Sequence, residues 1–213
     1  MNPARMFGSD VHPDASLDDP LDLLDLWLSR VEGTASPGGP SVDATSTPLM
    51  ALATIDQDGF PQVRHVLLST YDRGRLHFHT DTRTAKATEL EANPWAAATL
   101  AWPEIPRQLT VGGEVVAETA SERAAAYARR SRYLQLLAWV NDAELAKRSE
   151  ADRKRAWTEF DSAHPDLEPP PTWAGYALVP ERITFWRGIR DAPSQRVVCR
   201  RTSGSWSIER LPG

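Results

Sequence analysis

Apolar residues recur with two different periods along this chain, and the two periods together predict strands interrupted by helices. Short runs in which every second residue is apolar, bounded by Gly, Pro, Asn or Asp, are typical of strands. Longer runs with an apolar residue every three or four positions are typical of helices. The strand-like runs are 48–55, 61–70, 75–81, 95–102, 107–119, 175–186, 195–201 and 205–211, and the helix-like runs are 20–33, 83–94, 121–140 and 144–164. Eight or so short strands with inserted helices predict a mainly β fold with added α, a small β-barrel with helical additions.

Turn and cap residues add local detail to this pattern. Asp72 and Gly74 lie between two strand-like runs, where both residue types suit unusual backbone angles. The Gly-Gly pair within 107–119 predicts a β-bulge. Ser121 precedes an Ala- and Arg-rich run and is the predicted N-cap of a helix.

Composition narrows the class of protein. The 213 residues suit one domain, and 41% apolar with 25% charged residues suits a soluble globular protein. A net charge of −5 argues against a surface built to bind nucleic acid. Residues 1–19 are polar and predict a mobile N-terminal arm, which leaves a single domain over 20–213.

Compartment signals are few, and they agree with one another. No apolar run approaches the roughly 18 residues of a membrane-spanning helix, and the N-terminus lacks the apolar centre of a secretory signal. Cys199 is the single cysteine, so no intrachain disulfide can form. We therefore expect a cytoplasmic protein that contacts no membrane.

The common catalytic signatures are missing from the sequence. There is no G-x-G-x-x-G turn after a strand, no G-x-x-x-x-G-K phosphate loop and no G-x-S-x-G nucleophile turn. His77 and His79 alternate in one strand-like run and are expected to share a face. No Cys or acid stands at a matching metal-binding spacing. The sequence therefore predicts no metal site, assigns no catalytic residue, and favours a polar or pocket-lining face for the two histidines.

Four stretches of the chain together resemble the pyridoxamine 5′-phosphate oxidase family, whose fold is an FMN-binding split barrel. The stretches are 51–69, 76–115, 173–188 and 205–213, and they match in order and at nearly matching spacing. The resemblance implies a homodimer with FMN at the subunit interface and a small-molecule substrate. It also implies that Trp186 and Arg196 reach the FMN of the partner subunit.

The resemblance implies a set of FMN-binding residues spread over several strands. Arg64 and Lys86 are cations suited to the phosphate, and Lys86 lies in the first turn of a predicted helix, where anions bind. The strand from Arg64 is expected to lie along the flavin ring. The full implied set is Arg64, His65, Val66, Leu67, Leu68, Ser69, His79, Thr80, Lys86, Gln108, Trp186 and Arg196.

The chain departs from the family pattern at the cofactor. The family's Ser-Arg-Lys is Thr84-Ala85-Lys86 here, so one cation is missing unless Arg83 replaces it. One charge-assisted hydrogen bond contributes about 1.5–3 kcal/mol, so FMN is expected to bind roughly tenfold or more weakly. The family's Gln-Ser pair is Ala143-Glu144 here, which removes another polar contact.

The departures are larger at the substrate. The Lys that holds the substrate phosphate in the family is Ser69 here, and an Arg and a His that face the substrate are Ala192 and Ser194. Tyr127, together with Arg130 or Arg132, can replace two further family residues, whereas a family Ser falls near Leu134. The candidate substrate-binding residues are Ser69, Tyr127, Arg130 and Ser194.

The expected function is therefore an FMN-dependent oxidase with a diverged substrate site, acting on a non-B6 amine or dihydro-aromatic compound. One alternative is a genuine pyridoxamine/pyridoxine 5′-phosphate oxidase. Another is a non-catalytic flavin-binding dimer, and a further one is a barrel that binds a deazaflavin or heme. Flavin chemistry does not always need a protein acid or base, so the missing charged groups leave flavin chemistry possible but argue against a tightly held, phosphorylated substrate.

Overall fold

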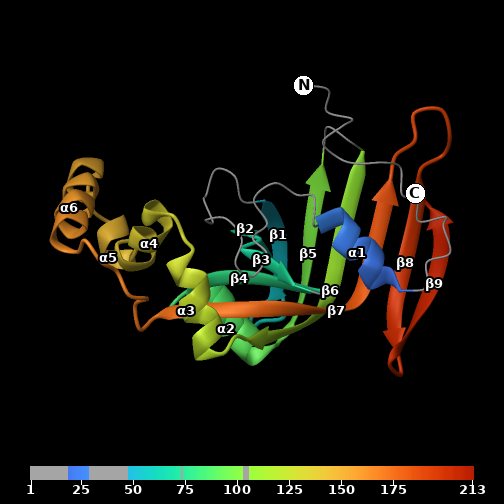
Figure 1. Cartoon of the computed structure of the whole chain (residues 1–213), viewed down its shortest axis with the longest axis horizontal. Coiled ribbons are helices and arrows are strands. Elements are labelled where there is room, and N and C mark those ends of the chain that lie inside the picture. Colours follow the sequence, from blue (N-terminus) through green and yellow to red (C-terminus); the bar gives the residue numbers. More distant parts are fainter. Residues whose placement is uncertain (1–18, 29–47, 73, 103–105) are drawn as a thin grey trace.

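The computed structural model describes residues 19–28, 48–72, 74–102 and 106–213, and this part of the chain forms one antiparallel nine-stranded sheet (Figure 1). The strand order is β2-β1-β5-β6-β7-β4-β3, with β8 paired to β7 and β9 paired to β8. The strands are β1 (Leu49–Ile55), β2 (Pro61–Leu67), β3 (Thr70–Asp72), β4 (Arg75–Asp81), β5 (Trp95–Trp102), β6 (Arg107–Ala117), β7 (Trp173–Arg187), β8 (Gln195–Thr202) and β9 (Ser205–Pro212). The prediction of a mainly β barrel with added helices is confirmed. The additional strand arises because the run 61–70 divides into β2 and β3.

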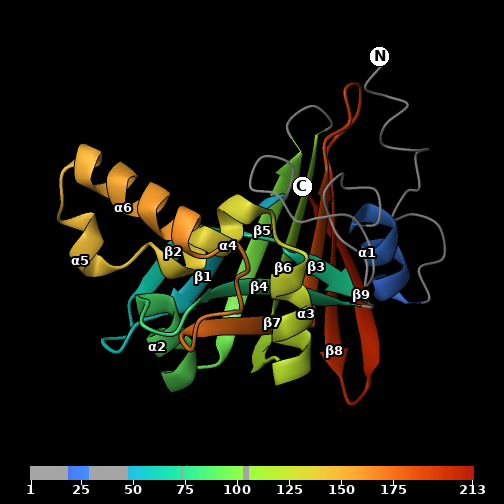
Figure 2. The ribbon, with the colours of Figure 1, turned by 60° about the vertical axis from the view of Figure 1, so that its left-hand side comes forward.

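Six helices are described, and they gather at different places around the sheet. They are α1 (Pro20–Leu28), α2 (Ala85–Ala92), α3 (Ala120–Ala128), α4 (Arg132–Trp139), α5 (Ala143–Ala146) and α6 (Glu150–Ala163). Figures 1 and 2 show α4, α5 and α6 together at the end of the molecule remote from β8 and β9. None of the described helices has the length and apolar character needed to span a bilayer.

Strand β7 organises the sheet because it is long enough to pair with two partners along one edge. Its first half, 173–178, pairs with β4, and its second half, 182–187, pairs with β8. Its other edge pairs with β6 along almost its whole length. The main apolar core lies on the inner face of these strands, where Leu109, Ile183 and Phe185 are at most 1% exposed.

The glycine-based predictions are confirmed. Gly74 closes the β3–β4 turn with φ +93°, a conformation that residues with a Cβ rarely adopt. The sheet register shifts between Gly112 and Gly113, which is the expected bulge. A Cβ on Gly113 would lie 1.8 Å from the carbonyl oxygen of Val179, so the close approach of β6 to β7 requires glycine there.

The predicted single helix 121–140 is wrong. It breaks into α3 and α4, because Arg129 ends α3 and Ser131 adopts an extended conformation before α4. Ser121 is not the N-cap. Thr119 accepts from the N–H of Glu122, whose carboxylate accepts from the Thr119 N–H in return, and this capping box begins α3 one residue earlier.

The predicted helix 144–164 divides as well. Asp142 caps the short α5, and the Ser149 side chain accepts from the Asp152 N–H to begin α6. At the N-terminal end, the predicted helix 20–33 is confirmed as far as Leu28, and 29–33 lie outside the described residues. The predicted mobile arm also lies outside them except for Asp19, so it stays a prediction.

Candidate functional site

The first turn of α2 gathers groups that bind a phosphate. Lys86 is half-buried, and its Nζ donates to Oγ1 of Thr80 at 3.1 Å. The N-cap residue Thr84 makes no side-chain cap, because its hydroxyl donates to the Asp81 carbonyl at 2.7 Å. A helix N-terminus without a side-chain cap, beside a cation and hydroxyl groups, attracts anions. Burial lowers the pKa of Lys86, and the neighbouring Arg64 guanidinium lowers it further.

Arg64 reaches this corner from β2 and already has a buried partner. Its Nη2 lies 2.8 Å from Oε2 of Glu89 on α2, and its Nη1 donates to the Thr54 hydroxyl. Glu89 is 6% exposed and also accepts from Thr54 at 2.5 Å. A phosphate at Lys86 would therefore share the Arg64 charge with a carboxylate. Arg83 is also paired, since its exposed guanidinium lies 2.6 Å from the Asp81 carboxylate, and its role as the replacement cation stays a prediction.

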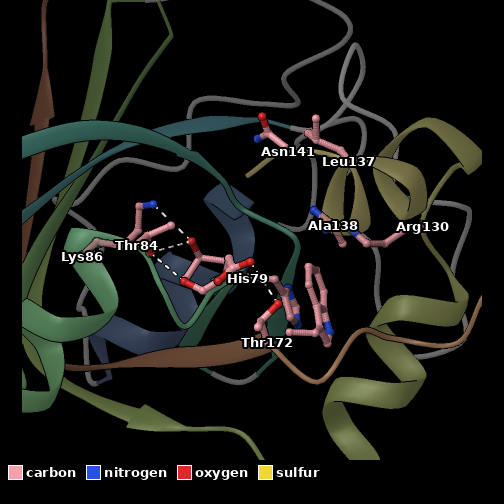
Figure 3. A pocket seen from close by; sticks show the side chains of 11 residues that line it. His79, Thr84, Lys86, Arg130, Leu137, Ala138, Asn141 and Thr172 are labelled. Atoms are coloured by element: carbon pink, nitrogen blue, oxygen red, sulfur yellow. Dashed lines mark hydrogen bonds between the residues drawn. The ribbon is translucent and has the colours of Figure 1, made fainter. Parts of the chain in front are cut away.

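A pocket of about 210 Å³ opens beside the first turn of α2 (Figure 3). Lys86 and Arg130 lie on opposite sides of it. The pocket thus offers two cationic positions, one at each side. The lining residues are His79, Thr80, Asp81, Thr84, Lys86, Arg130, Leu137, Ala138, Asn141, Thr172 and Trp173.

Arg130 is the most unusual charge in this pocket. Its guanidinium carbon lies 4.4 Å from the centre of the Trp173 ring, a cation–π contact. Burial lowers its pKa to about 10. Among the described residues, no carboxylate pairs with it and its Nε has no hydrogen-bond partner. Arg130 is half-buried, and a partly desolvated cation without a counterion carries a cost that an anion in the pocket would relieve.

The neighbouring Arg132 has a different role, which separates the two arginines that the sequence left as alternatives. Its Nε donates to Oδ1 of Asp161 at 2.8 Å, and its Nη2 donates to the His164 carbonyl. Arg132 therefore ties α4 to α6. Tyr127 is 1% exposed, and its hydroxyl donates to the Gln135 carbonyl at 3.1 Å. Of these three residues, Arg130 is the one that lines the pocket.

The expected flavin strand, residues 64–69, alternates between the core and the outside. Val66 and Leu68 belong to the core, and Ser69 is 3% exposed with no partner for its hydroxyl among the described residues. Leu67 packs beside Leu134 of α4, and His65 is exposed on the outer face.

The outer face of the sheet carries the remaining predicted FMN residues. Gln108, Trp186 and Arg196 pair across β6, β7 and β8, so their side chains share one face. The next row on the same face runs from His65 across five further strands to Val198. The intervening residues of that row are small, namely Ala51, Thr99, Thr110 and Thr184.

The predicted FMN residues therefore form two groups within one chain. From His65 on β2 to Val198 on β8 there are five inter-strand steps, or roughly 24 Å along the sheet at about 4.8 Å each. The group around Arg64 and Lys86 lies at one side of this span, and Trp186 with Arg196 lies at the other. One chain does not bring the two groups together.

The turn between β7 and β8 also lies apart from the pocket. Ala192 is exposed, and the Ser194 carbonyl accepts from the Gly213 N–H at 3.2 Å. Neither residue lines the pocket beside α2. The assignment of Ser194 to substrate binding stays a prediction.

Glu118 is a site residue that sequence reasoning missed. His77 and His79 share a face as predicted, and both rings contact the Glu118 carboxylate, at 2.6 and 3.0 Å. The sequence shows that Glu118 directly follows a predicted strand. It does not show which strands lie beside that one, and only the folded sheet brings Glu118 next to β4. Within the described part of the chain, no group of three His, Cys, Asp or Glu side chains is placed to hold a metal ion.

The donors around Lys86 fit the phosphate of FMN. A cation, two threonine hydroxyls and a helix N-terminus without a side-chain cap converge there, with Arg64 close by. Ala85 supplies no second cation. The predicted contacts to the flavin ring from Gln108, Trp186 and Arg196 lie on the outer face of the same chain, away from Lys86.

Comparisons with known proteins identify the family of the chain. Residues 43–167 match the family model described as pyridoxamine 5′-phosphate oxidase, and residues 173–212 match the pyridoxine 5′-phosphate oxidase C-terminal dimerisation region. A pyridoxine/pyridoxamine 5′-phosphate oxidase from Caulobacter vibrioides is 33% identical over 201 residues, which cover 93% of this chain and 87% of that protein. The enzyme of the same description from Pseudomonas paraeruginosa is 36% identical, with 91% and 88% covered.

Solved structures share the fold. The chain superposes on PhzG from Burkholderia lata, solved in complex with tetrahydrophenazine-1-carboxylic acid, with a TM-score of 0.80 and 24% identity, covering 96% of this chain and 98% of PhzG. An FMN-binding protein from Nostoc punctiforme gives a TM-score of 0.66 at 23% identity, with 78% and 88% covered. The two family models, the full-length relatives and the split-barrel fold agree: the chain belongs to the pyridoxamine 5′-phosphate oxidase family of FMN-dependent oxidases.

Proposed function

We propose that this protein is a homodimeric FMN-dependent oxidase that acts on a phosphorylated substrate, pyridoxine or pyridoxamine 5′-phosphate. The observation that carries the proposal is Arg130, a half-buried guanidinium that faces a pocket without a carboxylate partner in the described chain. It favours an anionic substrate over the less anionic one expected from the sequence. The relatives with 33–36% identity, named for this activity, support the same choice.

The cofactor site would use residues from two copies. Lys86, Thr80, Arg64 and the first turn of α2 would hold the FMN phosphate of one subunit. Bound FMN would supply the two-electron oxidation of a carbon beside a hydroxyl or amine, with dioxygen as the final acceptor.

The partner subunit would supply the groups that one chain lacks beside Lys86. Trp186, Gln108 and Arg196 share the outer face with small residues, which leave room on that face for a second copy to approach. The C-terminal match to a dimerisation region supports this arrangement.

The protein's own task would be to orient the substrate and exclude water. Arg130, stacked on Trp173, would fix the phosphate of the substrate by a charge-assisted hydrogen bond. Holding the reacting carbon in one geometry would lower the entropic part of the activation barrier, and this effect needs no protein acid or base.

A second candidate keeps the fold and cofactor but takes a non-phosphorylated amine or dihydro-aromatic substrate. It is favoured by Ser69, Ala192 and Ser194, where the resemblance would place Lys, Arg and His. A dimer that binds flavin without turnover differs from both candidates in one measurable outcome, since it would give no product with any donor.

Hydrogen peroxide formation by the purified yellow protein tests these candidates. We expect turnover with pyridoxine 5′-phosphate and a much lower kcat/KM with unphosphorylated pyridoxine, because the latter cannot use Arg130. Turnover of a dihydro-aromatic donor alone would support the second candidate. Colourless protein that cannot be reconstituted with FMN would contradict both.

A further inference from the structure

Two histidines of β4 converge on one buried carboxylate directly after β6. Oε1 of Glu118 lies 2.6 Å from Nδ1 of His77, and its Oε2 lies 3.0 Å from Nε2 of His79. The side chains of Glu118 and His79 are 3% and 1% exposed. Burial raises the pKa of Glu118, but the hydrogen bonds from the two histidines outweigh it and lower that pKa to about 2. The carboxylate is therefore ionised and held between two rings.

The fold makes room for this carboxylate at one glycine. Gly175 on β7 pairs with His79, and its carbonyl accepts from the Glu118 N–H at 2.9 Å. A Cβ at Gly175 would lie 2.0 Å from Oε2 of Glu118 and 3.0 Å from Cδ2 of His79. Real Cβ contacts do not approach so closely, so any larger residue at this position would displace the carboxylate.

The network reaches the pocket through two stacked contacts. The His79 ring lies parallel to the Trp173 ring, with centroids 5.0 Å apart and planes 3° apart. The Arg130 guanidinium lies against the same indole. Glu118, His77 and Arg130 are the charged groups that act on His79, and burial is the main cause of its lowered pKa, which keeps the ring neutral. Asp72 lies 3.3 Å from the far nitrogen of His77.

We propose that Glu118 is a positioning residue for the pocket: it fixes the His79 ring, which supports Trp173, which holds the Arg130 guanidinium where it binds an anion. The inference deepens the proposed function and rests on it in taking Arg130 as the group that binds the substrate phosphate. In metal sites, replacing a group that orients a ligand commonly costs roughly 10–100-fold in affinity; Glu118 acts through two rings, so the lower end of that range is expected.

Glu118→Gln, with Glu114→Gln as the matched control, tests the proposal without turnover. Glu114 is exposed on β6, four residues before Glu118. The FMN-loaded protein is titrated with inorganic phosphate, and the rise in Tm gives the dissociation constant. We expect Glu118→Gln to weaken phosphate binding roughly tenfold and Glu114→Gln to leave it unchanged. Arg130→Gln provides the reference for complete loss of this site.

Nitrogen NMR of the histidine rings supplies the second measurement. Because Glu118 accepts from Nε2 of His79, the wild type should show His79 as the neutral Nε2–H tautomer, and Glu118→Gln should alter it. Glu118→Gln with altered His79 signals but unchanged phosphate affinity would overturn the proposal. If Glu118→Gln does not fold, Gly175→Ala displaces the same carboxylate while keeping its charge, and the same weakening is expected.

The failure of the proposed function gives a different result. Wild-type phosphate binding that does not depend on Arg130 would remove the basis of both proposals. Phosphate binding through Arg130 that is indifferent to Glu118 and to Gly175→Ala would overturn this inference alone and leave the phosphorylated substrate in place.

Discussion

The pocket beside α2 and the outer face of β5–β8 differ in how their polar groups are satisfied. Behind the pocket, charged groups are paired within the chain: Glu118 contacts two histidines, and Arg64 pairs with the buried Glu89. On the outer face, the row from His65 to Val198 is built of small side chains and contains no buried ion pair in the described chain.

The difference shows which half of the site one chain can build. Polar lining residues such as Thr84 and Lys86 are half-buried and hydrogen-bonded within their own chain, so their positions do not depend on a partner. The small residues of the outer face leave space that their own chain does not fill, and a second copy could cover them. On the proposed function, the pocket is a property of the monomer, whereas the ring end of the cofactor site is a property of the pair.

Thr110→Arg should give the largest effect, because it places a charge in the middle of the outer face. We expect loss of the dimer and, with it, loss of bound flavin and of activity. Light scattering after size-exclusion chromatography and the visible spectrum measure the two losses. Thr158→Arg, on exposed α6, is the control. A Thr110→Arg protein that stays dimeric and yellow would contradict the assignment of this face to the partner.

Acid should destabilise the pocket region through Glu118. Its folded pKa of about 2 lies below the ordinary value of 4.5, so its contribution is present above pH 4.5 and is lost as pH falls towards 2. A shift of this size corresponds to about 3 kcal/mol. Urea unfolding between pH 6 and 3 should show a steeper loss for wild type than for Glu118→Gln, and equal slopes would refute the assignment.

Arg130→Gln should raise KM for pyridoxine 5′-phosphate roughly 10–100-fold, the range expected for a hydrogen bond to a charged group. KM for a non-phosphorylated donor should change little. Arg132→Gln is the matched control, because Arg132 joins α4 to α6 and should lower Tm without changing KM. An equal rise in KM for phosphorylated and non-phosphorylated donors would show that Arg130 shapes the pocket without binding phosphate.

Ala85→Arg should strengthen FMN binding by roughly tenfold, since it adds one cation to the first turn of α2. Arg83 is close to this turn, but its guanidinium is paired with Asp81. Fluorescence titration of the flavin-free protein measures the change. Unchanged affinity would mean that Arg64 and Lys86 already neutralise the phosphate despite the competition from Glu89.

Sequence patterns predicted the strands, the bulge and the position of Lys86 because each depends on nearby residues. The break between α3 and α4 was not predicted, since Ala and Arg favour helix on both sides of it. The distinction between Arg130 and Arg132 could not be predicted either. The two differ only in what packs beside them, Trp173 from β7 and Asp161 from α6, and both partners are distant in sequence. The same reason hid Glu118, whose partners lie on another strand.

Thr119→Ala should give the smallest effect. It tests whether the position of Arg130 depends on the start of α3. Thr119 and Glu122 form the capping box of α3, the helix that precedes Arg130. Loss of such a cap costs about 1 kcal/mol, so Tm should fall by a few degrees. Ser121→Ala should leave Tm nearly unchanged, because Ser121 lies within the helix and Thr119 makes the cap. KM for pyridoxine 5′-phosphate should also stay unchanged in Thr119→Ala, because Trp173 rather than the start of α3 supports the guanidinium. A raised KM in this variant would show instead that Arg130 depends on the helix before it.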